Sequence, residues 1–290
     1  MTKNQKKSRF GWLRDLPDLR DYTVNHEAVR PLLKKVGVLK AGRATLPKKA
    51  DLRRWCSPVE DQGDLGSCTA QAGAGVVEYF QRKAYGKHID ASRRFLYKVT
   101  RNLMHETGDS GAYLRTTMGA LTLFGVPPEE YWPYDVESFD EEPPAFCYSF
   151  AQNYQSVKYL RLDPPGTDGK GLLAQIKGNL AAGMPAMFGF TCYSSIDGAD
   201  DGKIPFPTPK EAVVGGHAIV AVGYDDDLKI KNPHADQATV GALLVRNSWG
   251  PGWGEDGYGW LPYEYVLQGL AVDWWALISN EWVDTGEFKL

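Results

Sequence analysis

The fold of this 290-residue chain is decided by the stretch Gln62-Gly63-Asp64-Leu65-Gly66-Ser67-Cys68. The cysteine opens a run in which Ala70, Ala74 and Val77 recur at three- to four-residue spacing. This spacing predicts a helix with one buried face over residues 69–85. Cys68 would then lie at the positive end of the helix dipole, which lowers the pKa of a thiol and favours the nucleophilic thiolate.

Two polar residues far downstream complete a chemical pattern. His217 opens an apolar run that ends at Tyr224, and this run predicts a strand that holds the imidazole rigidly. A second predicted strand, residues 241–245, leads to Asn247. An imidazole beside a thiol can act as its base, and an amide that accepts the other ring N–H fixes the tautomer. The order Cys68, His217, Asn247 therefore predicts a nucleophile, a base and an orienting group.

These motifs resemble those of the papain-like cysteine peptidases, in particular the bacterial xylellain-like type. The resemblance begins at Leu46-Pro47 and runs through Ser57-Pro58-Val59-Glu60-Asp61-Gln62-Gly63 to Cys68. It is strongest over Asn247-Ser248-Trp249-Gly250-Pro251-Gly252-Trp253-Gly254-Glu255-Asp256-Gly257-Tyr258. It implies a cysteine endopeptidase that hydrolyses peptide bonds through a thioester on Cys68.

The resemblance also implies roles for single residues. Cys68 would be the nucleophile, His217 the base and then the acid, and Asn247 the orienter. Gln62 would complete the oxyanion hole together with the Cys68 backbone N–H, a kind of contact whose loss costs about 2.7–4 kcal/mol of transition-state stabilisation. Taken singly, each of these residues fits a plain structural role, since buried cysteines and histidines are common in protein cores. Their joint order favours catalysis.

The implied fold is α+β, with a helical lobe, an antiparallel β-barrel-like lobe and the active-site cleft between them. We expect residues 1–45 to form an N-terminal basic arm and residues 46–290 the peptidase domain. Within that domain the helical lobe would span about 55–155 and the strand-rich lobe about 156–283. A chain of 290 residues with 43% hydrophobic content can bury two such lobes.

By the same resemblance, substrate would lie along the backbone of Gly111 and Ala112, as an added strand. The main apolar subsite would be lined by Leu114, Gly189 and Gly215, and its small residues indicate room for a large apolar or aromatic side chain. Two tryptophans would flank the catalytic residues. Trp249 would cover the hydrogen bond between His217 and Asn247, and Trp253 would form a wall on the leaving-group side.

The chain departs from the family pattern at a disulfide. The position three before the nucleophile, usually a bridged cysteine in this family, is Leu65, and its partner position is Asp109. Both halves of the bridge are therefore replaced together. The spacing from His217 to Asn247 is longer than usual, and residues 225–239 read as an extended hairpin.

The first 50 residues carry 13 Lys plus Arg against 4 Asp plus Glu, a net charge of +9, whereas the whole chain has −3. A basic arm on an acidic body favours docking within the molecule. Phe10, Trp12, Leu13 and Leu16 supply apolar anchors. We expect the arm to lie across the cleft and keep the enzyme latent until it is displaced or cleaved, as an inhibitory pro-segment. The alternative is a basic leader without a role.

The remaining sequence features indicate the cellular location and the binding partners of the protein. No secretory hydrophobic segment is found near the N-terminus, and the odd number of cysteines besides Cys68, namely three, fits a reducing compartment. The sequence thus favours a cytoplasmic location over export. We expect peptide or protein substrates and the chain's own arm as partners, with no cofactor, no metal, no nucleic acid and no membrane.

Two alternatives to an endopeptidase stay open. The same thioester chemistry can pass the acyl group to an amine, as in an amidase or transpeptidase. The fold can also serve as a binding protein without turnover, although the complete set Gln62, Cys68, His217 and Asn247 argues against that.

Overall fold

The computed structural model describes residues 10–35, 37–38 and 46–280. The α-helices of this part are α1 Arg30–Lys35, α3 Cys68–Tyr85, α4 Arg93–Met104, α5 Leu114–Leu123, α6 Ala145–Ala151, α7 Gly169–Ala181 and α8 Glu264–Leu267. Short 3-10 helices are η1 Arg53–Trp55, η2 Glu129–Tyr131, η3 Gln152–Tyr154 and η4 Ser194–Gly198.

The strands are β1 Trp12–Leu13, β2 Lys49–Asp51, β3 Ala112–Tyr113, β4 Ser156–Arg161, β5 Ala186–Tyr193, β6 Val213–Ile230, β7 Thr239–Arg246, β8 Tyr258–Pro262 and β9 Ala271–Asn280. Most of them form one seven-stranded sheet in the order β4-β9-β5-β6-β7-β8, with β2 paired to β6, and all its pairs are antiparallel. A separate two-stranded sheet joins β1 and β3 in parallel.

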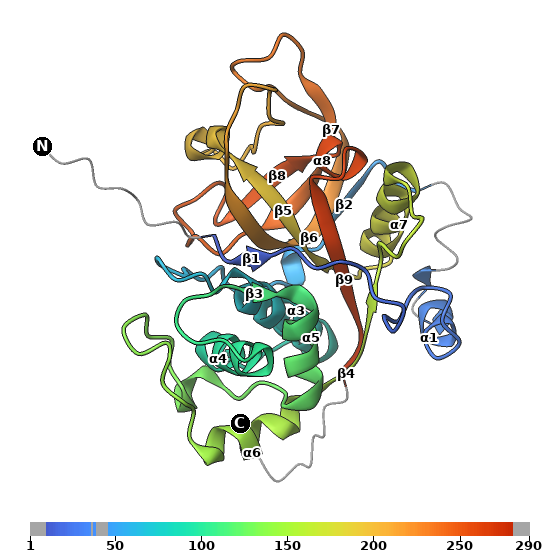
Figure 1. Cartoon of the computed structure of the whole chain (residues 1–290). Helices are drawn as coiled ribbons and strands as arrows, with labels where there is room; N and C mark the ends of the chain where they lie inside the picture. Colours follow the sequence, from blue (N-terminus) through green and yellow to red (C-terminus); the bar gives the residue numbers. More distant parts are fainter. Residues whose placement is uncertain (1–9, 36, 39–45, 281–290) are drawn as a thin grey trace, which may run out of the picture.

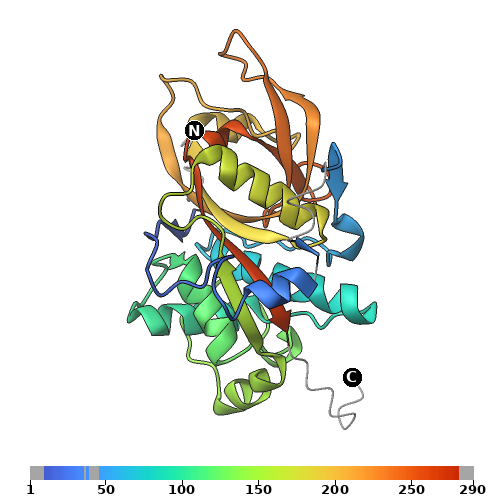
Figure 2. The same ribbon diagram turned by 90° about the vertical axis from the view of Figure 1, so that its right-hand side faces the viewer.

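Figure 1 shows two lobes, with the helices α3 to α6 below and strands β5 to β8 above. The short strand β1 runs between them. In the quarter-turn view, α7 lies across the upper sheet and α1 sits beneath it (Figure 2). The strands β6 and β7 pair as far out as Ile230 and Thr239, so the long spacing between His217 and Asn247 is an extended hairpin.

The long strand β6 shows how one sheet serves two cores. Ala218, Val220 and Val222 join the core formed with α3, α4 and α5, whereas Ile219 and Ala221 join the core that includes residues of α7. Successive side chains of a strand point to opposite faces, so an uninterrupted apolar run is what a strand covered on both sides requires. His217 is at the start of this run and is thereby fixed between the lobes.

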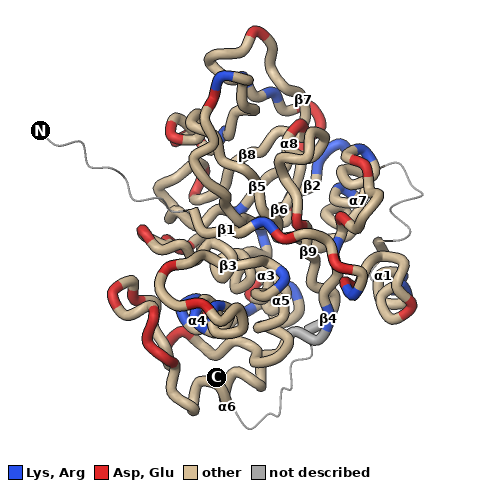
Figure 3. The backbone as a smooth tube through the Cα atoms, in the orientation of Figure 1, with Lys and Arg blue, Asp and Glu red and all other residues tan. Residues whose placement is uncertain are grey.

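The helical lobe is braced by charge at its edge. Acidic residues of the loop that precedes α6 lie beside the basic residues of α4 (Figure 3). Arg101 is fully buried, and its guanidinium pairs with Asp140 at 2.6 Å and lies over the rings of Tyr97 and Phe139. Without these partners the buried charge of Arg101 would be strongly destabilising.

A buried polar cluster connects α3 of the helical lobe to the end of β7 in the sheet. Glu78 on α3 accepts hydrogen bonds from Ser57 Oγ and, at 2.9 Å, from the backbone N–H of Ala91. Arg246, at the end of β7, donates to Ser57 Oγ at 3.0 Å. Glycine at position 75 makes room for it, because a Cβ there would lie 2.8 Å from Arg246 Nη1. The cluster thus connects the helix that begins at the predicted nucleophile to the residue that precedes Asn247.

We predict that Glu78 makes stability depend on pH. Burial raises its pKa from 4.5 to about 7, and Arg246 opposes this only in part. A carboxyl with a raised folded-state pKa stabilises the protein fully below pH 4.5, and this contribution is lost as the pH rises through about 7. The variant Glu78→Gln lacks that loss, so its unfolding free energy relative to the wild type should rise by up to about 3 kcal/mol across this range.

Denaturant titrations at several pH values measure this difference, with Glu106→Gln, a change of an exposed carboxyl, as the control. A difference between Glu78→Gln and the wild type that does not change with pH would contradict the prediction.

Candidate active site

Cys68 is the first residue of α3, as the sequence pattern predicts to within one residue. Ser67 is the N-cap, and its side chain makes no capping hydrogen bond. The Cys68 side chain is fully buried. The thiol therefore lies at the positive end of an 18-residue helix and at the boundary of the two lobes.

His217 and Asn247 come together from neighbouring strands. His217 Nε2 lies 2.8 Å from Asn247 Oδ1, and the same oxygen accepts the backbone N–H of Ser248 at 2.8 Å. Because Oδ1 is an acceptor, Nε2 carries the ring hydrogen and Nδ1 holds the lone pair. In the described part of the chain Nδ1 is buried and has no hydrogen-bond partner. The imidazole is thus held in the tautomer in which Nδ1 can accept a proton.

Both predicted tryptophans lie beside this pair. The ring of Trp249 stacks on the imidazole of His217, with centroids 4.8 Å apart and an interplanar angle of 25°. Trp253 meets Trp249 edge to face at 5.5 Å. The indole of Trp249 therefore covers one face of the imidazole and limits access of water to it.

Gln62 is fully buried and is anchored from both lobes. Its backbone N–H donates to Ser248 O at 2.9 Å, and its side-chain Oε1 accepts from Ser248 Oγ at 2.5 Å. Its Nε2 donates to Leu65 O at 2.7 Å, within the loop that leads to Cys68. These contacts fix the orientation of the amide, with its nitrogen towards the loop of the thiol.

A carboxylate stands where the family's disulfide would be. Asp109 accepts the backbone N–H of Gly66 at 3.0 and 3.1 Å and the hydroxyl of Tyr97 at 2.6 Å. The same hydroxyl oxygen accepts the backbone N–H of Gly111 at 3.1 Å. Leu65 is buried in the core. Hydrogen bonds through Asp109 and Tyr97 thus join the loop of the thiol to the edge at Gly111, a connection that no disulfide makes in this chain, because all four cysteines are free.

The N-terminal arm passes over this site. The backbone of Gly11 crosses between Gly66 and Gly111 so closely that a Cβ on either would meet Gly11 atoms at 3.3 or 2.3 Å, respectively. Gly11 O accepts the backbone N–H of Ala112 at 2.8 Å, and Trp12 pairs with Ala112 in the parallel ladder of β1 and β3. The edge at Gly111 and Ala112, predicted to bind substrate, is therefore occupied by the chain itself.

Two aromatic side chains of the arm fill the adjoining surface. Phe10 lies edge-on to His217 and to Trp249, with centroids 6.2 Å apart in each case, and it occupies the space above Gly215. Trp12 is 7% exposed, and its indole covers Gly189, where a Cβ would come within 1.9 Å of the ring.

Of the predicted subsite residues, Gly189 and Gly215 border the arm's aromatic rings, whereas Leu114 is a fully buried core residue at the start of α5. The sequence reasoning missed two residues of this pocket. Gly216 lies against Trp12, and Asp273 accepts the indole N–H of Trp12 at 3.1 Å. The sequence signal that could have indicated Asp273 is that it is the single acidic residue within the apolar run from Leu270 to Ile278.

Burial of the thiol and the imidazole reverses the protonation that the sequence predicts. The pKa of Cys68 is raised by burial to about 11, although the backbone N–H groups of Ala218 and Gly11 lower it in part. Burial lowers the pKa of His217 to about 4, against a raising effect of Asn247. The expectation of a lowered thiol pKa is wrong for this arm-covered form, because burial raises the pKa by more than the backbone N–H groups lower it. At neutral pH the pair is thiol and neutral imidazole.

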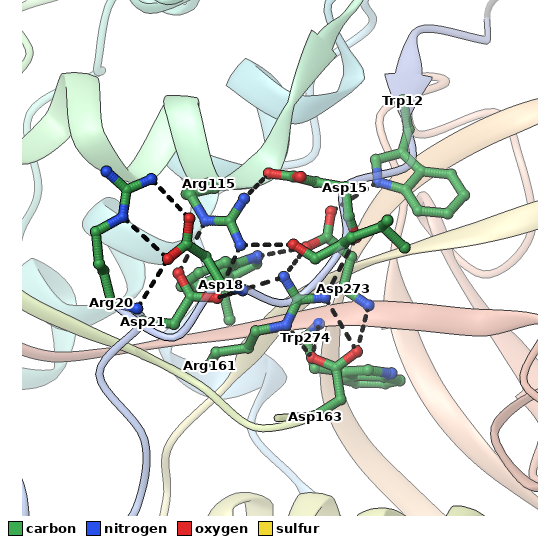
Figure 4. A network of polar contacts seen from close by, with 12 residues as sticks. Trp12, Asp15, Asp18, Arg20, Asp21, Arg115, Arg161, Asp163, Asp273 and Trp274 are labelled. Atoms are coloured by element: carbon green, nitrogen blue, oxygen red, sulfur yellow. Dashed lines mark hydrogen bonds and ion pairs between the residues drawn. The ribbon is translucent and has the colours of Figure 1, made fainter. Parts of the chain in front are cut away.

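The ion pairs between residues 15–21 of the arm and the body have their charges the other way round from the prediction, with the acid on the arm and the base on the body. Arg115 of α5 binds three groups of the arm: Asp15, Asp21 at 2.8 Å and the carbonyl of Leu16 at 2.8 Å (Figure 4). Arg161 of β4 adds a longer contact, 3.8 Å, to Asp21. Acidic arm residues thus meet basic body residues here, while the basic residues 3–9 lie outside the described part. Farther along, Lys48 and Lys49 pair with Asp227 and Asp225, as the net charges predict.

The described residues show neither a metal-binding cluster nor a membrane-spanning helix. They hold no group of three or more His, Cys, Asp or Glu side chains arranged to bind a metal ion. None of their helices has the length and apolar character needed to cross a membrane.

Comparison with known proteins agrees with this geometry. Residues 46–268 match the family described as papain family cysteine protease. The structure is similar to that of xylellain, a cysteine protease from Xylella fastidiosa, with 33% identity, a TM-score of 0.74, and coverage of 96% of this chain and 99% of that one.

Sequence relatives extend the likeness. An uncharacterized peptidase C1-like protein of Acanthamoeba polyphaga mimivirus is 33% identical over 284 residues, 92% of this chain and 86% of that protein. A cathepsin B-like protein of Giardia intestinalis is 28% identical over 80% of this chain and 78% of its own length. A family match that spans more than half of the chain and these similarities agree with the two-lobe architecture and with the cysteine at the start of α3. The chain belongs to the papain family of cysteine proteases.

Proposed function

We propose that this protease cleaves peptide bonds with Cys68 as nucleophile, His217 as base and acid, Asn247 as orienter and Gln62 as oxyanion donor, and that its N-terminal arm holds it latent. The observation that carries the catalytic part is the 2.8 Å contact between His217 Nε2 and Asn247 Oδ1, which leaves Nδ1 as the basic nitrogen. The crossing of Gly11 over the thiol's loop supports the latent part.

The chemistry begins when the arm is displaced. His217 Nδ1 takes the proton of the Cys68 thiol, and the sulfur attacks the carbonyl carbon of the scissile bond. The oxyanion that forms is stabilised by the Cys68 backbone N–H and the Gln62 amide. His217 then gives its proton to the leaving amine, and a thioester remains on Cys68. Water, deprotonated by His217, hydrolyses the thioester and restores the free thiol.

The proposed latency has two causes: the arm occupies the place of the substrate, and the thiol and imidazole are shielded from water. The segment 10–13, here called the cleft segment, covers the thiol, uses the strand edge at Ala112 and fills the pocket at Gly189. It also keeps water away from the thiol and imidazole, which favours their neutral forms. Displacing the segment removes both obstacles together.

The direct test compares hydrolysis of a fluorogenic peptide library by three proteins: the full chain, a chain that starts at Leu46, and that shortened chain carrying Cys68→Ala. We expect activity in the shortened chain, with a drop of about 10⁴-fold or more on replacing the nucleophile, and little activity in the full chain. Equal activity of the two cysteine-bearing chains would contradict latency. A shortened chain that is folded by circular dichroism yet inactive would contradict the catalytic assignment.

The contacts of Arg115 give a second prediction. The variant Arg115→Ala leaves Asp15 without its partner and removes the close partner of Asp21, a carboxylate that is only 6% exposed. Loss of a partly buried pair of this kind weakens arm docking by more than about 1.4 kcal/mol, which corresponds to about tenfold or more in the population of displaced arm. The activity of the full-length variant should rise by that factor.

Arg20→Ala is the matched control. Arg20 is 90% exposed and pairs only with Asp18 among the described residues, so its removal should leave activity unchanged. If Arg115→Ala and Arg20→Ala have equal activity, arm docking does not depend on Arg115.

A further inference from the structure

The carboxylate of Asp273 lies at the base of the pocket that Trp12 fills. Asp273 is fully buried and has a backbone φ of 61°, a left-handed conformation that is uncommon outside glycine. It lies in β9 where the pairing with β5 shifts register, between Met187 and Gly189. Bulges and positive φ values re-aim side chains and occur at functional sites. Here they accompany a carboxylate that accepts the indole N–H of Trp12.

We infer that Asp273 makes this pocket selective for a substrate side chain that is flat, aromatic and carries an N–H donor, that is, tryptophan. This inference rests on the proposed function, because the pocket belongs to the same cleft. The arm's own Trp12 shows how such a side chain is held, with its indole N–H 3.1 Å from Asp273 Oδ2 (Figure 4).

The shape of the pocket is set by glycines. A Cβ at Gly189 would lie 1.9 Å from the Trp12 ring, and one at Gly216 would lie 2.8 Å from it. Neither glycine has a positive φ, so neither is required by the backbone conformation. Their effect is to leave a flat space beside the sheet that an indole fills.

The charge around Asp273 favours a neutral donor over a cation. Asp273 Oδ1 already pairs with Arg161 Nη1 at 3.2 Å and accepts the indole N–H of Trp275 at 2.8 Å. A substrate lysine or arginine would therefore bring a second positive charge next to Arg161, which is only 1% exposed. Asp273 Oδ2 accepts from Trp12, and a neutral N–H fits that place without repulsion.

The ionised state of Asp273 and its fixed backbone also support its role as an acceptor for the N–H of a substrate side chain. Burial raises the pKa of Asp273 to about 6, so the carboxylate is mostly ionised at pH 7.5. The neighbouring backbone is fixed, because Asp163 accepts the N–H of Asp273 at 2.7 Å and that of Trp274 at 3.0 Å. A side chain without an N–H would leave a buried carboxylate oxygen unpaired, and sites of this kind discriminate strongly against analogues that lack the donor.

The test uses the full chain with the arm weakened by Phe10→Ala and Trp12→Ala, at pH 7.5. Fluorogenic peptides carry, at each of three positions before the cleaved bond, either tryptophan or 3-benzothienylalanine, in which sulfur replaces the indole N–H at nearly equal size. Further peptides carry arginine or phenylalanine at the same positions. We expect kcat/KM for tryptophan to exceed that for the sulfur analogue and for arginine by about tenfold at one position.

In Asp273→Asn, which keeps an acceptor of the same shape without charge, the ratio should shrink to about two- to threefold, and in Asp273→Leu it should vanish. Equal values for tryptophan and its sulfur analogue in the protein with Asp273 intact would overturn the inference, whether or not the variants fold.

A binding measurement separates the inference from the proposed function. Adding Cys68→Ala to the arm-weakened chain allows the dissociation constants of the same peptides to be measured by calorimetry without turnover. A tenfold preference in binding without hydrolysis by the cysteine-bearing chain would support the pocket and contradict the proposed function. Hydrolysis without a preference for tryptophan would support the proposed function and contradict the inference about the pocket.

Discussion

The passage of Gly11 between Gly66 and Gly111 is the contact on which the proposed latency depends. No side chain fits at that crossing, so the arm's backbone reaches the thiol's loop directly. On either side of Gly11, Phe10 meets His217 and Trp12 enters the pocket at Gly189. In this arrangement Cys68 and His217 are both fully buried, and their burial favours the neutral thiol and the neutral imidazole.

The thiol, the imidazole and the orienting amide come from both lobes. The helical lobe supplies Cys68 at the start of α3, and the sheet supplies His217 and Asn247 from adjacent strands. Their alignment is maintained by polar contacts that are themselves buried, above all the contact of Arg246 with Ser57, which bonds to Glu78 on α3. Because an unpaired buried charge is costly, these contacts define one relative position of the lobes.

Part of this organisation was predictable from the sequence because it is local. The helix after Cys68, the apolar strand after His217 and the glycine-rich turn after Asn247 each follow from spacing along a short segment. The pocket's glycine at position 189 was also expected, from family resemblance. The role of Asp273 was not, since its contact with Trp12 joins residues that lie far apart in the sequence, and no single segment specifies it. The lowered thiol pKa was expected from the helix alone, whereas the raised pKa comes from burial, to which segments distant in the sequence contribute. At Arg115 the charges of the contact are opposite to those predicted for a basic arm, since net charge does not specify which residues touch.

The most direct test of this account is the pH dependence of the reaction of Cys68 with iodoacetamide, followed by mass spectrometry of the Cys68 peptide. The rate follows the thiolate fraction, so it reports the thiol pKa. In the full chain the account predicts slow reaction that is still rising steeply at pH 10, as for a pKa of about 11. With the cleft segment weakened by Phe10→Ala and Trp12→Ala, the midpoint should fall below the ordinary value of 9.0. Equal profiles for the two proteins would contradict the claim that the arm sets the state of the catalytic pair.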